Sequence, residues 1–238
     1  MSQQPDTRPQ DPTVIPGQNS QRSQVPGLST DEFAHLVEAC HALPLQKGTY
    51  LEKDFVTNVL LSVVDYQMRT PAVVRAMDYY KAHRKSELRS IDDLASVLQR
   101  FPDDKEGNTV LAQHLWGYNL WTRAHQLRGL VQYFEAWPVR NQEELIEWAK
   151  SSTFDDFAGQ VKGLGRAVYN FLVMRQGIDI VKPDVHVLRF VRSDVGRPVP
   201  ETVAVNALIA IAKLLDIRAY ELDWRIWEHE YSASGGKL

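Results

Sequence analysis

Residues 153–192 read TFDDFAGQVKGLGRAVYNFLVMRQGIDIVKPDVHVLRFVR and contain three consecutive helix signals. Thr153 and Asp156 have the spacing of a capping box, which predicts the start of a short helix. Beyond a Gly-Leu-Gly turn, apolar residues recur at helical spacing over 167–174 and predict a second helix. Asp184 is a favoured N-cap residue and precedes a third helical pattern. The stretch therefore predicts helices joined by short turns.

The same pattern extends over most of the chain, and the fold class that it predicts is all-α, with about ten helices. Further helices are expected from Ser29 or Thr30 onward, over about 53–67, from Thr70 onward, at about 91–101, 109–116, 120–136 and 142–150, and twice within 200–231. The segment 178–181 is typical of a strand, but it is too short and isolated to form a sheet.

The N-terminal segment differs in composition from the rest. Residues 1–28 contain six Gln, five Pro and three Ser, with almost no large apolar side chains. Such a segment buries too little apolar surface to offset the entropy of ordering it, so we expect a disordered tail. Its four charges cancel, which argues against a basic arm for nucleic acid. The total length of 238 residues fits one domain, or two small lobes that share a cleft.

The overall composition excludes several classes of protein. The chain has 27 Lys+Arg and 30 Asp+Glu, a formal net charge of −3, so it does not coat nucleic acid through bulk charge. No apolar run approaches the ~18 residues of a membrane-spanning helix, and no membrane partner is expected. A single cysteine, Cys40, excludes a disulfide framework, a Cys-rich zinc site and a four-cysteine iron–sulfur cluster, and indicates a reducing compartment. The seven His residues lack metal-site spacing, so neither metal nor cofactor is expected.

The Gly-Leu-Gly turn has two interpretations. Gly163 and Gly165 allow a hairpin with positive φ and leave no side chain between the backbone and a ligand. The N–H groups of Gly163, Gly165 and Arg166 would then converge at a helix N-terminus, where a phosphate is favourably bound. Taken alone, however, the pattern is more often a tight turn between helices, and Asp184 alone is more often a plain N-cap.

The complete order of these features is more specific. A helix, the Gly-Leu-Gly hairpin, a second helix, a turn and then the pattern Asp184-x-His186-x-x-Arg189 resemble the helix-hairpin-helix DNA glycosylase superfamily, in particular its endonuclease III and adenine-mismatch glycosylase members. The resemblance places Asp184 at the catalytic position. It also implies two helical lobes around an interlobe cleft. A central lobe of residues 53–192 would contain the helix-hairpin-helix motif, and a terminal lobe would combine 29–52 with 193–238.

Two upstream segments extend the resemblance to about residues 30–192. The segment Gly117-Tyr118-Asn119, followed by Arg123-Ala124, is similar to the family's Tyr-Asn-x-Lys-Ala segment. The segment 60–67 is similar to a family helix that ends in Ser-x-Gln, so Gln67 would enter the duplex beside an extruded base; its other interpretation is an ordinary polar helix end. The DNA-binding residues implied by the resemblance are Lys162, Gly163, Leu164, Gly165, Arg166, Gln67, Lys182 and Arg189.

The sequence departs from the family pattern at one chemically important position. Endonuclease III-type enzymes carry a Lys there that forms a Schiff base with the sugar, whereas this chain has Ala167. The expected activity is therefore that of a monofunctional glycosylase, without strand-cleaving lyase activity. Lys162 and Lys182 are near in sequence but not at the motif position, so they are weaker candidates for the amine.

The expected partner is double-stranded DNA that contains a damaged or mismatched base. From Lys162 to Arg197 there are seven basic and three acidic residues, so this span is positive within an acidic chain. We expect a monomer that is cytoplasmic and nucleoid-associated, or nuclear in a eukaryote. The alternatives are a catalytically inactive helix-hairpin-helix protein that binds damaged or distorted DNA, and an all-helical protein–protein adaptor whose Gly-Leu-Gly segment is only a turn. The sequence leaves the target base open.

Overall fold

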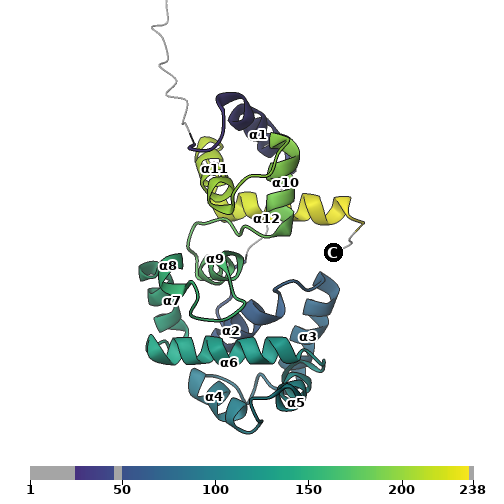
Figure 1. Ribbon diagram of the computed structural model, residues 1–238, viewed down its shortest axis with the longest axis vertical. Coiled ribbons are helices and arrows are strands. Elements are labelled where there is room, and N and C mark those ends of the chain that lie inside the picture. The colour runs from purple at the N-terminus through teal and green to yellow at the C-terminus, as the bar shows by residue number, and fades with distance from the viewer. Residues whose placement is uncertain (1–24, 46–49, 236–238) are drawn as a thin grey trace, which may run out of the picture.

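The computed structural model describes residues 25–45 and 50–235, which form twelve helices (Figure 1). No strand occurs among these residues, so the all-α prediction is confirmed. The segment 178–181 is an irregular link rather than a strand. The helices are α1 (Thr30–Ala42), α2 (Phe55–Val64), α3 (Thr70–His83), α4 (Ile91–Gln99), α5 (Lys105–Trp116), α6 (Trp121–Ala136), α7 (Gln142–Ser151), α8 (Phe154–Phe157), α9 (Arg166–Arg175), α10 (Val185–Val195), α11 (Glu201–Leu214) and α12 (Ala219–Ala233).

Local capping explains where several helices begin. Ser29, Ser90 and Thr153 each form a complete capping box, in which the hydroxyl accepts from a backbone N–H of the first turn and an acidic side chain bonds back. Asp184 caps α10 in the same general way. The predicted starts at Ser29 or Thr30, Thr70, Thr153 and Asp184 are confirmed.

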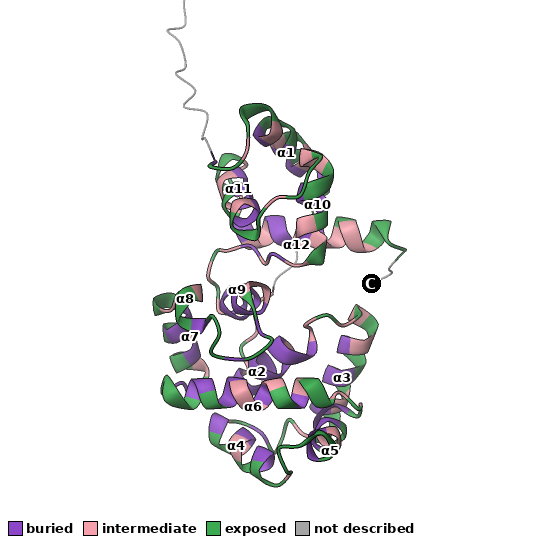
Figure 2. Ribbon diagram, viewed as in Figure 1, coloured by how far each residue is buried: buried purple, intermediate pink, exposed green. Residues whose placement is uncertain are grey.

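The buried side chains form two separate hydrophobic cores. The first core draws on α2 to α9, and α2 lies at its centre, buried on nearly every side (Figure 2). The second core draws on α1, α10, α11 and α12, which lie together at the other end of the molecule (Figure 1). The helix α9 lies between these two groups in the ribbon view.

The division between the cores differs from the expected lobe boundary after residue 192. Val187, Phe190 and Val191 of α10 belong to the second core, where α10 packs against α1, α11 and α12. The apolar face of α10 therefore groups with the terminal helices, and the chain crosses from one core to the other within the link between α9 and α10.

The expected disordered tail falls mostly on residues 1–24, which lie outside the described residues. The expectation was wrong for 25–28. Val25 is buried in the second core, and its carbonyl accepts a hydrogen bond from the N–H of Leu28 at 3.1 Å. Leu28 packs against the same core, and the carbonyl of Gly27 accepts a hydrogen bond from Arg197 at 2.9 Å, so residues 25–28 are ordered against the second core.

The link between the cores is held by polar side chains from both sides. The Asn170 amide on α9 donates to the carbonyl oxygen of Val181 at 2.7 Å. The carboxylate of Asp179 accepts from the N–H of Ala219, the first residue of α12, also at 2.7 Å. These bonds fix the path of the chain that leads to Asp184.

Candidate functional site

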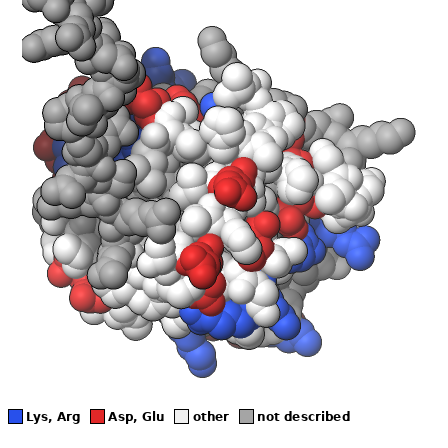
Figure 3. All heavy atoms as spheres, turned by 90° about the horizontal axis from the view of Figure 1, so that it is seen from above, with Lys and Arg blue, Asp and Glu red and all other residues white. Residues whose placement is uncertain are grey.

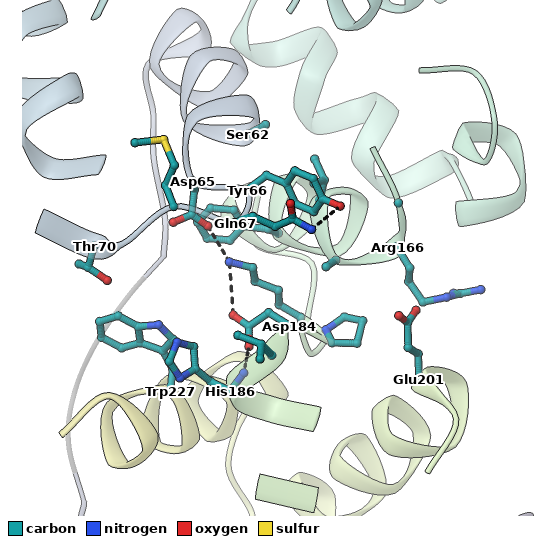
Figure 4. Close-up of a pocket in the computed structure, with 18 residues that line it drawn as sticks. Ser62, Asp65, Tyr66, Gln67, Thr70, Arg166, Asp184, His186, Glu201 and Trp227 are labelled. Carbon is teal, nitrogen blue, oxygen red and sulfur yellow. Dashed lines mark hydrogen bonds and ion pairs between the residues drawn. The ribbon is translucent and has the colours of Figure 1, made fainter. Parts of the chain in front are cut away.

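A pocket of about 340 Å³ lies where α2, α9, the link before α10 and α12 meet (Figure 4). Its lining combines residues on or next to the helices that form the first core with residues on or next to the helices that form the second. It is lined by Ser62, Asp65, Tyr66, Gln67, Met68, Thr70, Gly165, Arg166, Ala167, Val168, Phe171, Lys182, Pro183, Asp184, Val185, His186, Glu201 and Trp227.

Asp184 is both a helix cap and a wall of this pocket. Its Oδ1 accepts hydrogen bonds from the N–H groups of His186 at 2.9 Å and Val187 at 3.1 Å. Its Oδ2 lies 3.5 Å from the Nζ of Lys182, and the side chain is 16% exposed. The plain N-cap interpretation is therefore confirmed, and the same carboxylate still has one oxygen directed away from the helix.

Lys182 lies between two carboxylates. Its Nζ is 2.7 Å from Oδ2 of Asp65 and 3.5 Å from Oδ2 of Asp184, and it lies 4.0 Å from the centre of the Phe171 ring. Burial acts to lower the pKa of Lys182, but the charges of Asp65 and Asp184 outweigh burial and raise the pKa above its usual value. The amine therefore stays protonated at neutral pH, and a protonated amine is not a nucleophile.

Asp65 belongs to the site although its position in the sequence did not single it out. It is the C-cap of α2, and its side chain is 26% exposed. A charged residue directly after a helix that is buried on nearly every side was the available signal.

Trp227 reaches the same pocket from α12, with its ring 6.3 Å from that of His186. No local pattern connects Trp227 with residues 40 or more positions away.

Gln67 lines the pocket in an uncommon backbone conformation. Its φ is +55°, in the left-handed region that residues with a Cβ rarely adopt. Such conformations cost on the order of 1–3 kcal/mol and persist only where the surroundings impose them. Here the Arg123 guanidinium donates to the carbonyl of Tyr66 and lies 5.1 Å from the Tyr66 ring, and the Gln67 amide donates to the Tyr66 hydroxyl at 3.1 Å. The strain is thus located at an exposed residue beside the pocket.

The two glycines of the hairpin differ. Gly163 has φ of +83°, and an added Cβ would lie 2.7 Å from Nε2 of Gln126. Gly165, the N-cap of α9, has φ of −108°, and an added Cβ would meet no described atom within 4 Å. The positive φ of the hairpin therefore occurs at Gly163 and not at Gly165, because only the first glycine makes the left-handed turn.

The hairpin is anchored to the first core through its apolar side chains. Val161 and Leu164 are both buried there, at 2% and 4% exposure. Leu164 therefore presents only its backbone to the surface, whereas Lys162 is exposed. Neither Leu164 nor Lys162 belongs to the pocket lining, and the same is true of Gly163.

The N-terminus of α9 opens into the pocket. Among the described residues no side chain caps this end, and its first turn contains no acidic residue. Arg166 lies with its guanidinium 4.0 Å from the centre of the Phe154 ring. Ala167 follows and lines the pocket, at the position where the resemblance implies a lysine in lyase-active relatives. An uncapped, positively polarised helix end favours an anion.

Arg189 lies outside the pocket lining. Its Nε bonds to Oε2 of Glu230 on α12, and its Nη2 lies 3.0 Å from Nδ1 of His186. The structure therefore brings together Gln67, Gly165, Arg166, Lys182 and Asp184 in the pocket, and Lys162, Gly163, Leu164 and Arg189 lie outside its lining.

Across residues 25–45 and 50–235, no group of three or more His, Cys, Asp or Glu side chains is arranged to hold a metal ion. Within the same ranges, no helix combines the length and the apolar character that crossing a bilayer requires.

Comparison with known proteins identifies one family. No curated protein and no solved structure matches the chain. The family described as a domain of unknown function (DUF8548) matches residues 34–231. This match includes α2 to α11 in full, residues from both cores, and every residue of the pocket lining. The chain therefore belongs to the DUF8548 family.

Proposed function

We propose that the chain is a monofunctional DNA glycosylase, which turns a damaged or mismatched base out of the duplex and hydrolyses its N-glycosidic bond. The observation that carries this proposal is the pocket, which brings Asp184 together with Gln67 and the N-terminus of α9. The sequence resemblance gives these three features one common purpose. The pocket volume of about 340 Å³ lies within the range of small-molecule sites, about 300–1,000 Å³.

The proposed chemistry needs a fixed negative charge. A base within a duplex is inaccessible, so the nucleotide must be extruded before its glycosidic bond can break. Departure of the base leaves positive charge on the sugar, and a nearby carboxylate stabilises that state and orients water. Two backbone N–H groups hold Oδ1 of Asp184, so the carboxylate needs no reorganisation as the charge develops.

The remaining pocket residues have supporting roles in this proposal. Gln67 would fill the space that the extruded nucleotide leaves in the duplex. The uncapped N-terminus of α9 would bind a backbone phosphate near the pocket. Ala167 provides no amine, and the raised pKa of Lys182 keeps that neighbouring amine protonated. Together these features favour hydrolysis over Schiff-base chemistry.

The expected orientation of the duplex follows from surface charge. Figure 3 shows the end of the molecule that carries α1, α10 and α11. On the described part of this face, Asp and Glu side chains lie near the centre and Lys and Arg lie toward the edges. Because DNA is polyanionic, we expect it to contact the side of the molecule with the pocket and Lys162, and not this end.

One observation favours the alternative function, a catalytically inactive protein that binds distorted DNA. Lys182 already supplies a positive charge 3.5 Å from Asp184, where the sugar cation would have to be stabilised. A carboxylate with a permanent counter-ion has less charge available for a transition state. This alternative retains the pocket and DNA binding, and it lacks only base release.

The deciding experiment is a panel of duplexes that each carry one lesion: an alkylated purine, an oxidised base, uracil or a mismatch. Base release is measured after alkali treatment, and binding is measured with a duplex that contains an abasic-site analogue. Release from any member supports the glycosylase proposal. Tight binding to the abasic analogue without release from any member supports the inactive binder. Absence of both overturns the DNA-related proposals and leaves the adaptor.

A further inference from the structure

Asp223 on α12 is a fully buried carboxylate directly behind the pocket wall. It is 1% exposed and does not line the pocket. Its Oδ1 accepts a hydrogen bond from the backbone N–H of Lys182 at 2.7 Å. Its Oδ2 accepts one from the hydroxyl of Tyr50 at 2.9 Å. One side chain of α12 thus holds two segments that are distant from it in the sequence.

The segment that Asp223 holds leads straight to Asp184. After Lys182 comes Pro183, which has no N–H to donate. The N–H of Asp184 bonds back to the carbonyl oxygen of Lys182 at 2.8 Å. The bond from Lys182 to Asp223 is therefore the backbone anchor of this turn to α12.

Tyr50 is held firmly enough to serve as the second donor. Its ring makes edge-to-face contacts with Trp224, at 5.0 Å between ring centres, and with Phe171 of the pocket lining, at 5.8 Å. Burial, followed by the negative charge of Asp223, raises the pKa of Tyr50 well above its usual value. The hydroxyl therefore stays protonated and donates a hydrogen bond to Asp223.

We propose that Asp223 is a positioning residue: by accepting from Lys182 and Tyr50, it fixes the turn that places the Asp184 carboxylate in the pocket. This inference rests on the proposed function for its effect on base release. Its effect on the turn itself is independent of that function and has its own measurement.

The environment of Asp223 makes this positioning sensitive to pH. Burial and then the charge of Asp184 raise the pKa of Asp223 to about 7, against the opposing influence of the bonds from Lys182 and Tyr50. Asp65 on α2 lies on the far side of the Lys182 ammonium. An ionised Asp223 accepts from both donors, whereas a protonated one carries its own proton and must give up or reorient one bond. Positioning should therefore weaken as the pH falls below about 7.

Three variants test the proposal in single-turnover base release across a pH series. Asp223→Asn keeps an oxygen for the Lys182 N–H and an amide that donates to the Tyr50 oxygen, but it does not titrate. It should act like wild type above neutrality and lose the decline on the acid side. Asp223→Ala should lose ~10²-fold in the rate of base release at every pH, with DNA affinity unchanged, because a displacement of about 1 Å in a reacting group has that effect. Tyr50→Phe removes one of the two donors, so its rate of base release should lie between those of Asp223→Asn and Asp223→Ala.

Asp194→Asn is the matched control. Asp194 is a partly buried carboxylate near the C-terminal end of α10, and burial raises its pKa too. It lies ten residues from Asp184, about 15 Å along the helix. Its removal should leave the rate and its pH profile unchanged. A wild-type pH profile in Asp223→Asn, or full activity in Asp223→Ala, would overturn the proposal.

Amide NMR of the DNA-free protein separates this proposal from the proposed function. The Lys182 amide should shift with a midpoint near pH 7 in wild type, and that transition should vanish in Asp223→Asn. Any transition that the two proteins share arises from other groups, so the difference between them isolates Asp223. If the chemical shift of the Lys182 amide does not change with pH in wild type, the positioning role of Asp223 is refuted, whatever the enzyme assay gives. A lost transition together with no base release from any duplex refutes only the glycosylase function.

Discussion

Two segments meet at the pocket, and they are anchored in opposite ways. The hairpin before α9 is held by apolar side chains, Val161 and Leu164, which are buried in the first core. The link before α10 also buries Val181 in the second core, but its backbone is held by buried polar groups, of which Asp223 and Asn170 contact it directly. Apolar packing is insensitive to pH, whereas a buried carboxylate changes its bonding when it gains a proton. The position of the hairpin should therefore be independent of pH, whereas the position of the link should depend on pH.

The largest effect is expected for a substitution that removes the proposed catalytic carboxylate after the link and leaves the hairpin unchanged. Asp184→Asn should reduce base release by at least ~10²-fold, because a neutral amide does not stabilise a cationic sugar. Binding to an abasic duplex should remain, since the hairpin is unchanged. Parallel release and binding assays measure both quantities. Wild-type turnover in this variant would remove Asp184 from the mechanism.

The apolar anchor of the hairpin should contribute a large stability that does not depend on pH. Leu164→Ala should lower the free energy of unfolding by about 2–5 kcal/mol, the range for truncating a buried leucine. Chemical unfolding at about pH 5 and about pH 8 should give the same loss, because no titrating group is involved. A loss that changed between the two conditions would show that the hairpin also depends on charge.

The polar anchor of the link should show the opposite behaviour. The pKa of Asp223 is raised to about 7, whereas an unfolded aspartate titrates near 3.9. The protonated form is thus stabilised by folding, and that contribution is complete below about pH 4 and lost as the pH rises through 7. Asp223→Asn should remove a decline in the free energy of unfolding that is on the order of 1 kcal/mol per pH unit across this window. Equal pH dependence in wild type and variant would contradict the assignment.

A smaller effect is expected for the exposed cation of the hairpin. Lys162→Ala should weaken binding to every duplex alike, damaged or not, because a phosphate contact carries no sequence information. It should also flatten the slope of log K against log salt by about 0.9, the value for one released counter-ion. A salt titration of binding measures the slope. An unchanged slope would place Lys162 away from the DNA.

The smallest effect on stability, and the sharpest test of the hairpin, comes from Gly165→Ser. Serine is slightly better than glycine at an N-cap, by a few tenths of a kcal/mol, and the structure has room for its side chain. The variant should therefore unfold at a slightly higher temperature. DNA binding should weaken nonetheless, because the new hydroxyl occupies N–H groups that a phosphate would use. If the variant binds DNA as well as wild type, the hairpin is only a turn.

Local sequence signals predicted the parts of the molecule that depend on neighbouring residues. The helix starts at Ser29 and Thr153 and the cap at Asp184 follow from a few adjacent positions, and the all-α class follows from helical periodicity along the chain. The core to which α10 belongs was mispredicted, because an apolar helix face does not specify which partner will cover it. The Gly-Leu-Gly pattern did not specify which glycine makes the left-handed turn, and the structure places that turn at Gly163.

The candidate site was only partly predictable for the same physical reason. Gln67, Arg166 and Asp184 stand in recognisable motifs, and Asp65 has only the signal of a charged residue directly after a buried helix. Trp227 enters the pocket through long-range packing alone. Trp227 meets the other pocket residues only because α12 packs beneath the link. No spacing rule in a single sequence encodes a contact of that kind.

The bridge made by Lys182 has a mechanical consequence. Asp65 caps a helix of the first core, and Asp184 caps a helix of the second. The Lys182 ammonium therefore connects the two groups of helices. Any hinge motion that opens the pocket must lengthen one of its two contacts. These ion pairs lie within a largely buried site, where salt screens charges poorly. The angle between the two groups of helices should therefore change little even at high ionic strength.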